Sequence, residues 1–161
     1  MARRRYRRSL KSRSNYSHEN KGVTAVFGST FVNELIQAGA IIVPAVTTQG
    51  TRTVSNFTIT IPVDGTRAGE IFWALVYVPQ GETAKNLFAT TGSIEGSLYE
   101  PNQYVLASGI SDNAAGPIRI RTRMSRKLHS GDFISLIAGS PQSTFNGENL
   151  RALVSYSIKY N

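Results

Sequence analysis

The chain contains no cysteine, only two histidines and no long apolar run. Without cysteine, neither a disulfide framework nor a thiolate metal site is possible. No segment approaches the roughly 18 consecutive apolar residues that span a bilayer, and the N-terminus lacks the apolar stretch of a secretory signal. We therefore expect a protein that is made in the cytosol and does not insert into membranes.

Acidic residues are missing from the first fourteen positions, which hold six arginines and one lysine. Residues 1–21 contain eight basic residues and one acid, a net charge of +7. Residues 22–161 contain ten basic and nine acidic residues, a net charge of +1. The sequence therefore predicts a basic N-terminal arm, 1–21, joined to one nearly neutral domain, 22–161. Like charge should keep such an arm disordered on its own.

Charge is also scarce in the domain. Only 19 of its 140 residues are charged, about 14%, where an average soluble domain carries about 25%. Serine, threonine, asparagine and glutamine can keep a surface wet without charge. The scarcity nevertheless favours a domain that buries much of its exterior against copies of itself or other partners.

Apolar and polar residues alternate through much of the domain, as on strands with one buried face. Phe57, Ile59 and Ile61 show this pattern, and so does the segment 151–160. The run EIFWALVYVP, 70–79, is apolar in both phases and indicates a central strand, with Trp73 packed in the core. Five further runs bring the expected total to eight strands: 23–31, 38–47, 103–108, 117–124 and 132–138.

Turn-forming residues separate these runs, and no convincing amphipathic helix appears. The best short helix candidate is 81–89, and the longest connection is 80–101. Eight antiparallel strands in about 140 residues predict an all-β fold, with a sandwich, a jelly roll or a barrel as the architectures.

Catalytic groups are scarce. The two histidines are His18 in the arm and His129 beside a turn, and a lone turn histidine is usually a solvated side chain. No histidines have metal-ligand spacing, and no phosphate-binding loop motif occurs. We expect no enzymatic activity, no cofactor and no metal.

The arm indicates phosphate binding, because arginine outnumbers lysine there and guanidinium groups bridge phosphate oxygens. Eight basic residues on a single strand would give a log–log salt slope of about −6 and binding without sequence readout. Tyr6 and Tyr16 could stack on unpaired bases. A solubilising tail is the alternative, and RRRYRR is compatible with a nuclear import signal. The predicted binding residues of the arm are Arg3, Arg4, Arg5, Arg7, Arg8, Lys11, Arg13 and Lys21.

A second basic feature lies in PIRIRTRMSRKLHSGD, 117–132. On a strand, Arg119, Arg121 and Arg123 share one face and repel one another unless something acidic faces them. Carboxylates of a neighbouring subunit, nucleic-acid phosphates and solvent are the three alternatives. Arg126 and Lys127 are expected to extend this patch into the turn.

Several blocks of the sequence resemble capsid proteins of circovirus-like viruses, which have small circular single-stranded DNA genomes. The blocks are WALVYVPQG (73–81), GSLYEPNQYVLASG (96–109), GPIRIRTRMSRKLHSGDFISLI (116–137) and ALVSYSIKY (152–160). The resemblance implies a single eight-stranded jelly roll, about 60 copies of which close into an icosahedral shell with the arms on the genome inside. It places the protein in the virion, and in the host cell nucleus during assembly through the nuclear import machinery.

Other functions fit parts of the same pattern. A satellite-type RNA virus capsid has a similar size and plan, and a sequence-blind arm does not distinguish DNA from RNA. A cellular nucleic-acid-binding β-barrel would carry aromatics on an exposed sheet face, whereas most aromatics here fall on apolar phases. The arginine arm disfavours an extracellular receptor-binding trimer.

Overall fold

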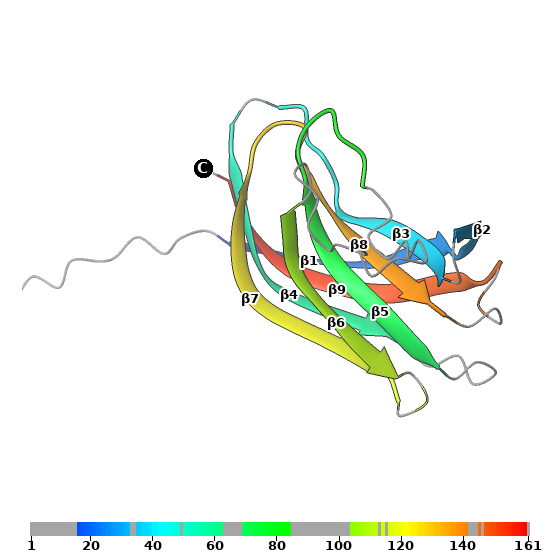
Figure 1. The fold of residues 1–161 in the computed structure, drawn as a ribbon. Coiled ribbons are helices and arrows are strands. Elements are labelled where there is room, and N and C mark those ends of the chain that lie inside the picture. The colour runs from blue at the N-terminus through cyan, green and yellow to red at the C-terminus, as the bar shows by residue number, and fades with distance from the viewer. Residues whose placement is uncertain are drawn as a thin grey trace, which may run out of the picture.

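The fold is all-β, as the alternation of the sequence predicts (Figure 1). The computed structural model describes residues 16–32, 35–48, 50–62, 69–84, 104–112, 114, 116–141, 145 and 147–160, with the backbone alone for 29–32, 35–37 and 104. Most of the predicted arm, the segment 85–103 and half of the helix candidate 81–89 therefore lie outside the described residues. Residues 81–84 of that candidate are not helical.

Within the residues that the structure describes, nine strands form two antiparallel sheets. The four-stranded sheet has the order β1-β9-β4-β7, and the five-stranded sheet has the order β2-β3-β8-β5-β6. The strands are β1 (Ser17–Val26), β2 (Gly28–Val32), β3 (Leu35–Val43), β4 (Arg52–Ile61), β5 (Glu70–Val78), β6 (Tyr104–Asp112), β7 (Ile118–Leu128), β8 (Phe133–Ser140) and β9 (Asn149–Tyr160).

The described part of the chain holds one strand more than the eight expected, because the run 23–31 divides at Phe27. The side chain of Phe27 is buried, and its ring lies 5.5 Å from the ring of Phe145. Its backbone N–H donates to Glu148 O at 2.8 Å, and its carbonyl accepts from the N–H of Gly147 at 3.0 Å. These bonds replace ladder bonds at the point where the chain leaves one sheet for the other. β1 also begins at Ser17, so the last five residues of the predicted arm belong to a strand.

Apart from β2, the strand pairs are nested in the sequence. β1 pairs with β9, β3 with β8, β4 with β7, and β5 with β6, all antiparallel. The chain thus passes first through β1, β3, β4 and β5. It then returns through β6, β7, β8 and β9, and each of these later strands pairs with one of the earlier four. Such a double ribbon, folded into two layers, leaves one long face of each sheet outside the core.

The core lies between the two sheets and takes alternate residues of their strands. On β9, Leu150, Ala152, Val154, Tyr156 and Ile158 are all buried, as the period of two predicts. The ring of Tyr156 lies 5.7 Å from the ring of Phe57. Trp73 is only partly buried and packs against this core from its margin, where its indole N–H donates to Ser111 Oγ at 3.2 Å.

Asp132 lies in the turn between β7 and β8, and its hydrogen bonds join three connecting segments at one end of the sandwich. Its carboxylate is buried and accepts hydrogen bonds from the phenol of Tyr77, the N–H of Gln80 and the N–H of His129 at 2.8, 3.1 and 2.7 Å. Its carbonyl accepts from Nη2 of Arg52 at 3.0 Å. We call this region the Asp132 end. Because Ser17 pairs with Ile158 near the end of β9, β1 also begins here.

Candidate nucleic-acid interface

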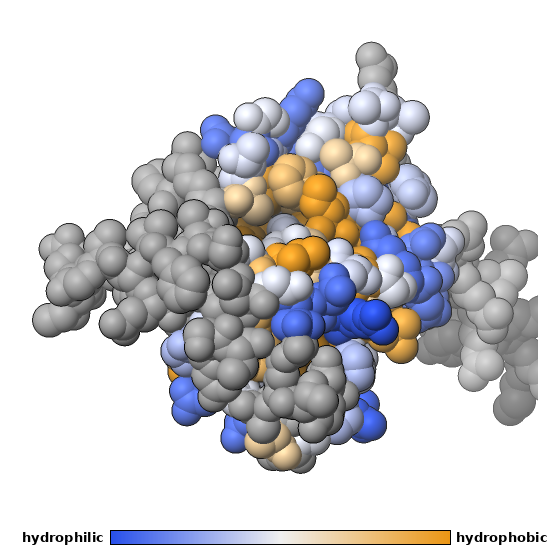
Figure 2. All heavy atoms as spheres, turned by 90° about the vertical axis from the view of Figure 1, so that its right-hand side faces the viewer, coloured by the Kyte–Doolittle hydropathy of each residue, from blue (hydrophilic) through white to orange (hydrophobic). Residues whose placement is uncertain are grey.

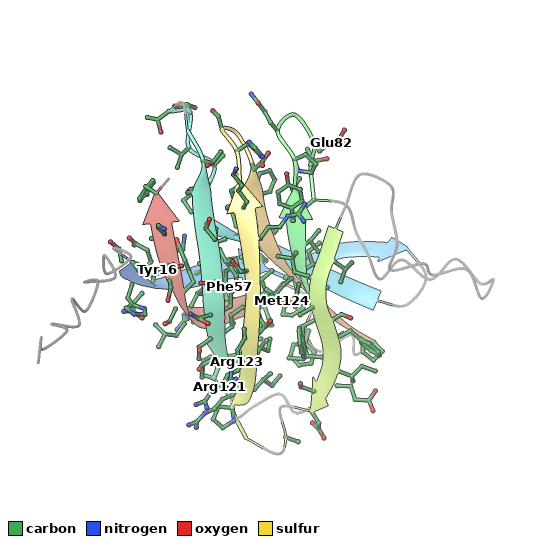
Figure 3. All side chains as sticks on the ribbon, turned by 90° about the vertical axis from the view of Figure 1, so that its left-hand side faces the viewer. Tyr16, Phe57, Glu82, Arg121, Arg123 and Met124 are labelled. Carbon is green, nitrogen blue, oxygen red and sulfur yellow. The ribbon has the colours of Figure 1, made fainter. Side chains whose placement is uncertain are left out.

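The arginines of β7 project from the outer face of the four-stranded sheet, as the period of two predicts. Ile118 and Ile120 are buried against the core, whereas Arg119, Arg121 and Arg123 between and beyond them are exposed. Successive stems on one face of a strand stand about 6.5 to 7 Å apart. The three guanidinium groups therefore form a column along the outer edge of the sheet, which Figure 3 shows at Arg121 and Arg123.

Hydroxyl side chains of β4 lie beside this column. Thr60 pairs with Arg119, and Thr58 pairs with Arg121. Further along, Thr53 pairs with Lys127 on one side and with Lys159 of β9 on the other. Neutral hydroxyls between cations donate to phosphate oxygens without opposing their charge.

β9 contributes two further basic residues to the same face, and neither was predicted there from the sequence. Arg151 and Lys159 alternate with the buried residues of β9 and point away from the core. Their period of two is visible in the sequence, but only the register places Lys159 opposite Thr53 and within one strand of β7. We define the basic face by its six cations: Arg119, Arg121, Arg123, Lys127, Arg151 and Lys159.

No acidic residue lies on this face among the described residues of β1, β9, β4 and β7. The repulsion among the six cations is therefore not relieved within the described part of the subunit. An external polyanion would relieve it and would be attracted over about a Debye length, roughly 8 Å at physiological salt.

A β-bulge hollows the face beside the arginine column. The register between β4 and both of its neighbours shifts at Asn56, whose φ of 55° is left-handed. Asparagine tolerates this conformation because its short amide can bond locally. The bulge borders a hollow of about 380 Å³, which is lined by Asn56, Thr58, Arg121 and Arg123, among others.

Arg126 is not part of the basic face, which corrects the expectation that it extends the patch. It pairs with the buried Val54, and its guanidinium carbon lies 4.2 Å from the centroid of the Tyr77 ring. Its position in the strand has the parity of Ile118 and Ile120, so it points between the sheets. This contact is a cation–π interaction that supports the Asp132 end.

Lys21 is the one predicted binding residue of the arm that the structure describes, and it also faces away from the basic face. It pairs with the buried Val154, and its Nζ lies 5.8 Å from the centroid of the Tyr156 ring. Burial lowers the pKa of its ammonium group, while Glu19 opposes that shift. Arg3, Arg4, Arg5, Arg7, Arg8, Lys11 and Arg13 lie outside the described residues.

Histidines and carboxylates do not gather into a metal site among the described residues. His129 is exposed, and His18 places Nδ1 3.3 Å from Ser157 Oγ. No helix in the described part of the chain is long and apolar enough to cross a membrane.

Several large hydrophobic side chains lie at the surface. In Figure 2, apolar side chains gather near the middle of one face, with hydrophilic ones on either side. Val26 and Leu153 are 58% and 59% exposed on β1 and β9, and Ile110 is 64% exposed on the edge strand β6. Exposed apolar side chains on a domain with little charge favour contacts with other protein surfaces.

Comparison with known proteins adds no relative. No protein-family model matches the chain, and no curated protein sequence matches it.

Proposed function

We propose that this protein is a capsid subunit that assembles into a small icosahedral shell and packages single-stranded nucleic acid, in the manner of the circovirus-like viruses that its sequence resembles. The observation that carries the proposal is the basic face: six cations, rows of hydroxyls and no acid among its described residues. A shell that packages nucleic acid of any sequence needs a positively charged surface and no contacts that distinguish the bases.

The strand order supports a jelly roll as the finer description of the sandwich. Four nested antiparallel pairs, divided between two sheets, are what two Greek keys in one double-layered domain require. Since β1 begins at the Asp132 end, the arm joins the domain beside Lys159 and Tyr160 of β9. The proposal assigns phosphate binding to the arm and to the basic face together.

The scarcity of charge in the domain and its exposed apolar side chains support self-assembly. A shell of about 60 copies is the smallest closed icosahedral arrangement. Single domains of this size, closely packed, would give particles of roughly 15 to 20 nm. Each arm would add seven positive charges to the interior.

Imaging of purified full-length protein tests the proposal. We expect uniform particles in negative stain and nucleic acid inside them that resists external nuclease. Digestion of the extracted nucleic acid by a single-strand DNase, and not by RNase, supports a DNA virus. The reverse result would identify the satellite-type RNA capsid instead. Monomers or small oligomers at both low and moderate salt would refute a shell of either kind.

A further inference from the structure

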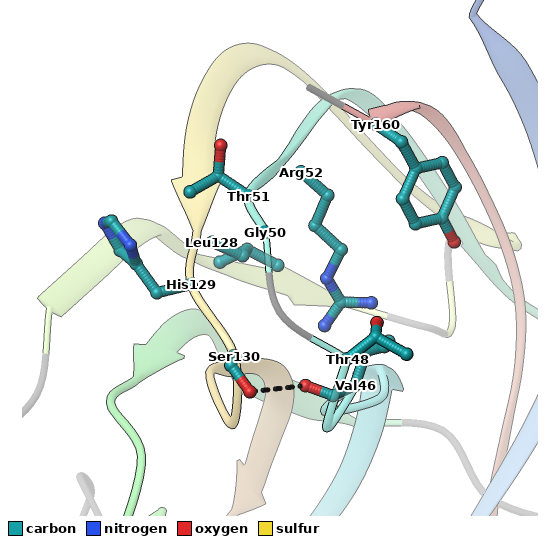
Figure 4. A pocket seen from close by; sticks show the side chains of 9 residues that line it. All are labelled: Val46, Thr48, Gly50, Thr51, Arg52, Leu128, His129, Ser130 and Tyr160. Carbon is teal, nitrogen blue, oxygen red and sulfur yellow. Dashed lines mark hydrogen bonds between the residues drawn. The ribbon is translucent and has the colours of Figure 1, made fainter.

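A second basic site lies at the Asp132 end, in a pocket of about 130 Å³ that the basic face does not include. Its walls come from the connection between β3 and β4, from the turn after β7 and from the end of β9 (Figure 4). Arg52, the first residue of β4, reaches from the strand into the middle of this pocket, toward Thr48. We call it the Arg52 pocket.

Arg52 is buried, and only part of the hydrogen-bonding capacity of its guanidinium group is filled within the described residues. Its side chain is 5% exposed, and Nη2 donates to two carbonyl oxygens, those of Pro44 and Asp132. Within the described residues, Nε and Nη1 of Arg52 have no hydrogen-bond partner. Because Arg52 lines the pocket, this edge of the guanidinium fork is available to an anion there.

No carboxylate neutralises Arg52 among the described residues. The carboxylate of Asp132 is committed to Tyr77, Gln80 and His129, and only the carbonyl of Asp132 bonds to the arginine. A buried charge held by neutral partners alone is costly, because the lost hydration is only partly replaced. An anion on the open edge of the fork would remove that cost.

The remaining walls suit an oxyanion. Thr48 presents a hydroxyl group at the guanidinium end of Arg52 (Figure 4), and none of the residues that line the pocket is acidic. A guanidinium edge with a hydroxyl nearby matches a tetrahedral group with several acceptor oxygens. A dry cavity of about 150 Å³ holds one benzene ring, so the Arg52 pocket has room for one phosphate group and not for a nucleoside.

We propose that the Arg52 pocket binds a single phosphate group, either inorganic phosphate or the terminal phosphate of a nucleic-acid strand. Arg52 pairs with Tyr160, and the neighbouring residue pair Val54–Ile158 extends across the sheet to Ser17. The pocket therefore lies about two strand spacings, roughly 10 Å, from the point where the arm joins the domain. Bound phosphate would brace the three connections of the Asp132 end. This inference does not depend on shell formation.

A matched pair of variants tests the site in the full-length chain after copurified nucleic acid has been removed. Thr48→Asp brings a carboxylate to Arg52, and Thr48→Asn makes the same change of shape without charge. We expect inorganic phosphate to raise the Tm of the wild type and of Thr48→Asn above the Tm in chloride of equal ionic strength. The rise should be about 4 °C at ten times Kd. Thr48→Asp should show no rise and should start from a higher Tm.

Each alternative outcome is informative. Equal Tm values in phosphate and chloride would mean that the pocket holds no phosphate. A rise that persists in Thr48→Asp would place phosphate elsewhere, for example on the arm, and would overturn the proposal. A rise lost in both variants still places phosphate at residue 48 and supports the site, with the Thr48 hydroxyl as a ligand that neither aspartate nor asparagine replaces.

The source of the phosphate is tested with a short oligodeoxynucleotide carrying or lacking a 5′-phosphate. Tighter binding of the phosphorylated strand, lost in Thr48→Asp and kept in Thr48→Asn, assigns the pocket to a strand terminus. Equal binding of the two strands, together with the Tm rise, assigns it to the free ion.

Discussion

The phenol of Tyr77 on β5 donates a 2.8 Å hydrogen bond to Oδ2 of Asp132, which lies between β7 and β8. The same oxygen also accepts from the N–H of His129, and Oδ1 accepts from the N–H of Gln80. One buried carboxylate thus holds a strand of the five-stranded sheet, the following loop and the turn that leaves the basic strand β7. The Arg52 pocket takes Leu128, His129 and Ser130 from the same region.

We therefore expect Asp132→Asn to destabilise the domain. The amide keeps one acceptor oxygen but turns an NH₂ group toward N–H or O–H donors, which leaves buried donors without partners. The loss should be about 2 to 4 kcal/mol of unfolding free energy, measured as the urea midpoint at a fixed protein concentration.

Asp112→Asn is the matched control, because Asp112 is exposed and its Oδ1 accepts from the N–H of Ala114, a bond that asparagine can keep. Its change should stay within about 0.5 kcal/mol. If the two variants unfold at the same urea concentration, the carboxylate of Asp132 does not brace this end.

Alkaline pH should destabilise the protein through two tyrosines. Burial raises the pKa of Tyr77, with further contributions from the hydrogen bond to Asp132 and its charge, and burial also raises the pKa of Tyr156. A group whose pKa is higher in the folded state stabilises the fold fully below its unfolded pKa. That stability is lost as the pH rises through the folded value. The unfolding free energy should therefore fall above about pH 10.

Tyr77→Phe isolates this effect. The variant should be less stable than the wild type at pH 8, by about 1 kcal/mol for the lost hydrogen bond, and its stability should fall less steeply above pH 10. Tyr16→Phe, at an exposed ring, serves as the control and should follow the wild-type curve. Urea midpoints between pH 8 and 11 give the comparison, and parallel curves for Tyr77→Phe and the wild type would contradict it.

Gly109 on β6 allows the close approach of Trp73, the single tryptophan of the chain. A Cβ at residue 109 would lie 2.6 Å from Cζ2 of the indole ring. Gly109→Ala should therefore displace the ring, cost about 1 to 3 kcal/mol and shift the tryptophan fluorescence. Gly39→Ala is the control, since its Cβ would meet nothing within 4 Å. An unchanged emission spectrum in Gly109→Ala would show that the indole is free to move.

The sequence alone predicted most of the strands and the buried positions of β7 and β9, but not which segments lie against them. Alternation is a local property, so the outward arginines of β7 and the buried residues of β9 could be read directly. The same parity places Arg126 with Ile118 and Ile120, a signal that the turn beyond it obscured.

Features that depend on register or on distant segments could not be read in this way. Lys159 joins the basic face only because β9 pairs with β4. The Arg52 pocket brings residue 52 onto carbonyls of residues 44 and 132, which are 8 and 80 positions away. The division of the run 23–31 at Phe27 likewise depends on backbone bonds to Gly147 and Glu148.

Arg121 and Arg123 border the hollow at Asn56, and the proposed function makes them phosphate ligands. Replacing both with glutamine in the full-length protein should remove two phosphate contacts. The slope of log K against log salt should then fall in magnitude by about 1.4, because each contact on a single strand contributes about 0.7.

Arg121→Lys with Arg123→Lys keeps both charges and should keep the slope, even if the loss of fork geometry weakens binding. Fluorescence anisotropy with labelled single strands of two unrelated sequences, titrated at several salt concentrations, measures both quantities. Because phosphate contacts carry no base information, the glutamine variant should lose affinity equally for the two strands. A slope unchanged by the glutamine pair would leave the arm as the sole site of phosphate binding and would return the β7 column to the alternative of carboxylates on a neighbouring subunit.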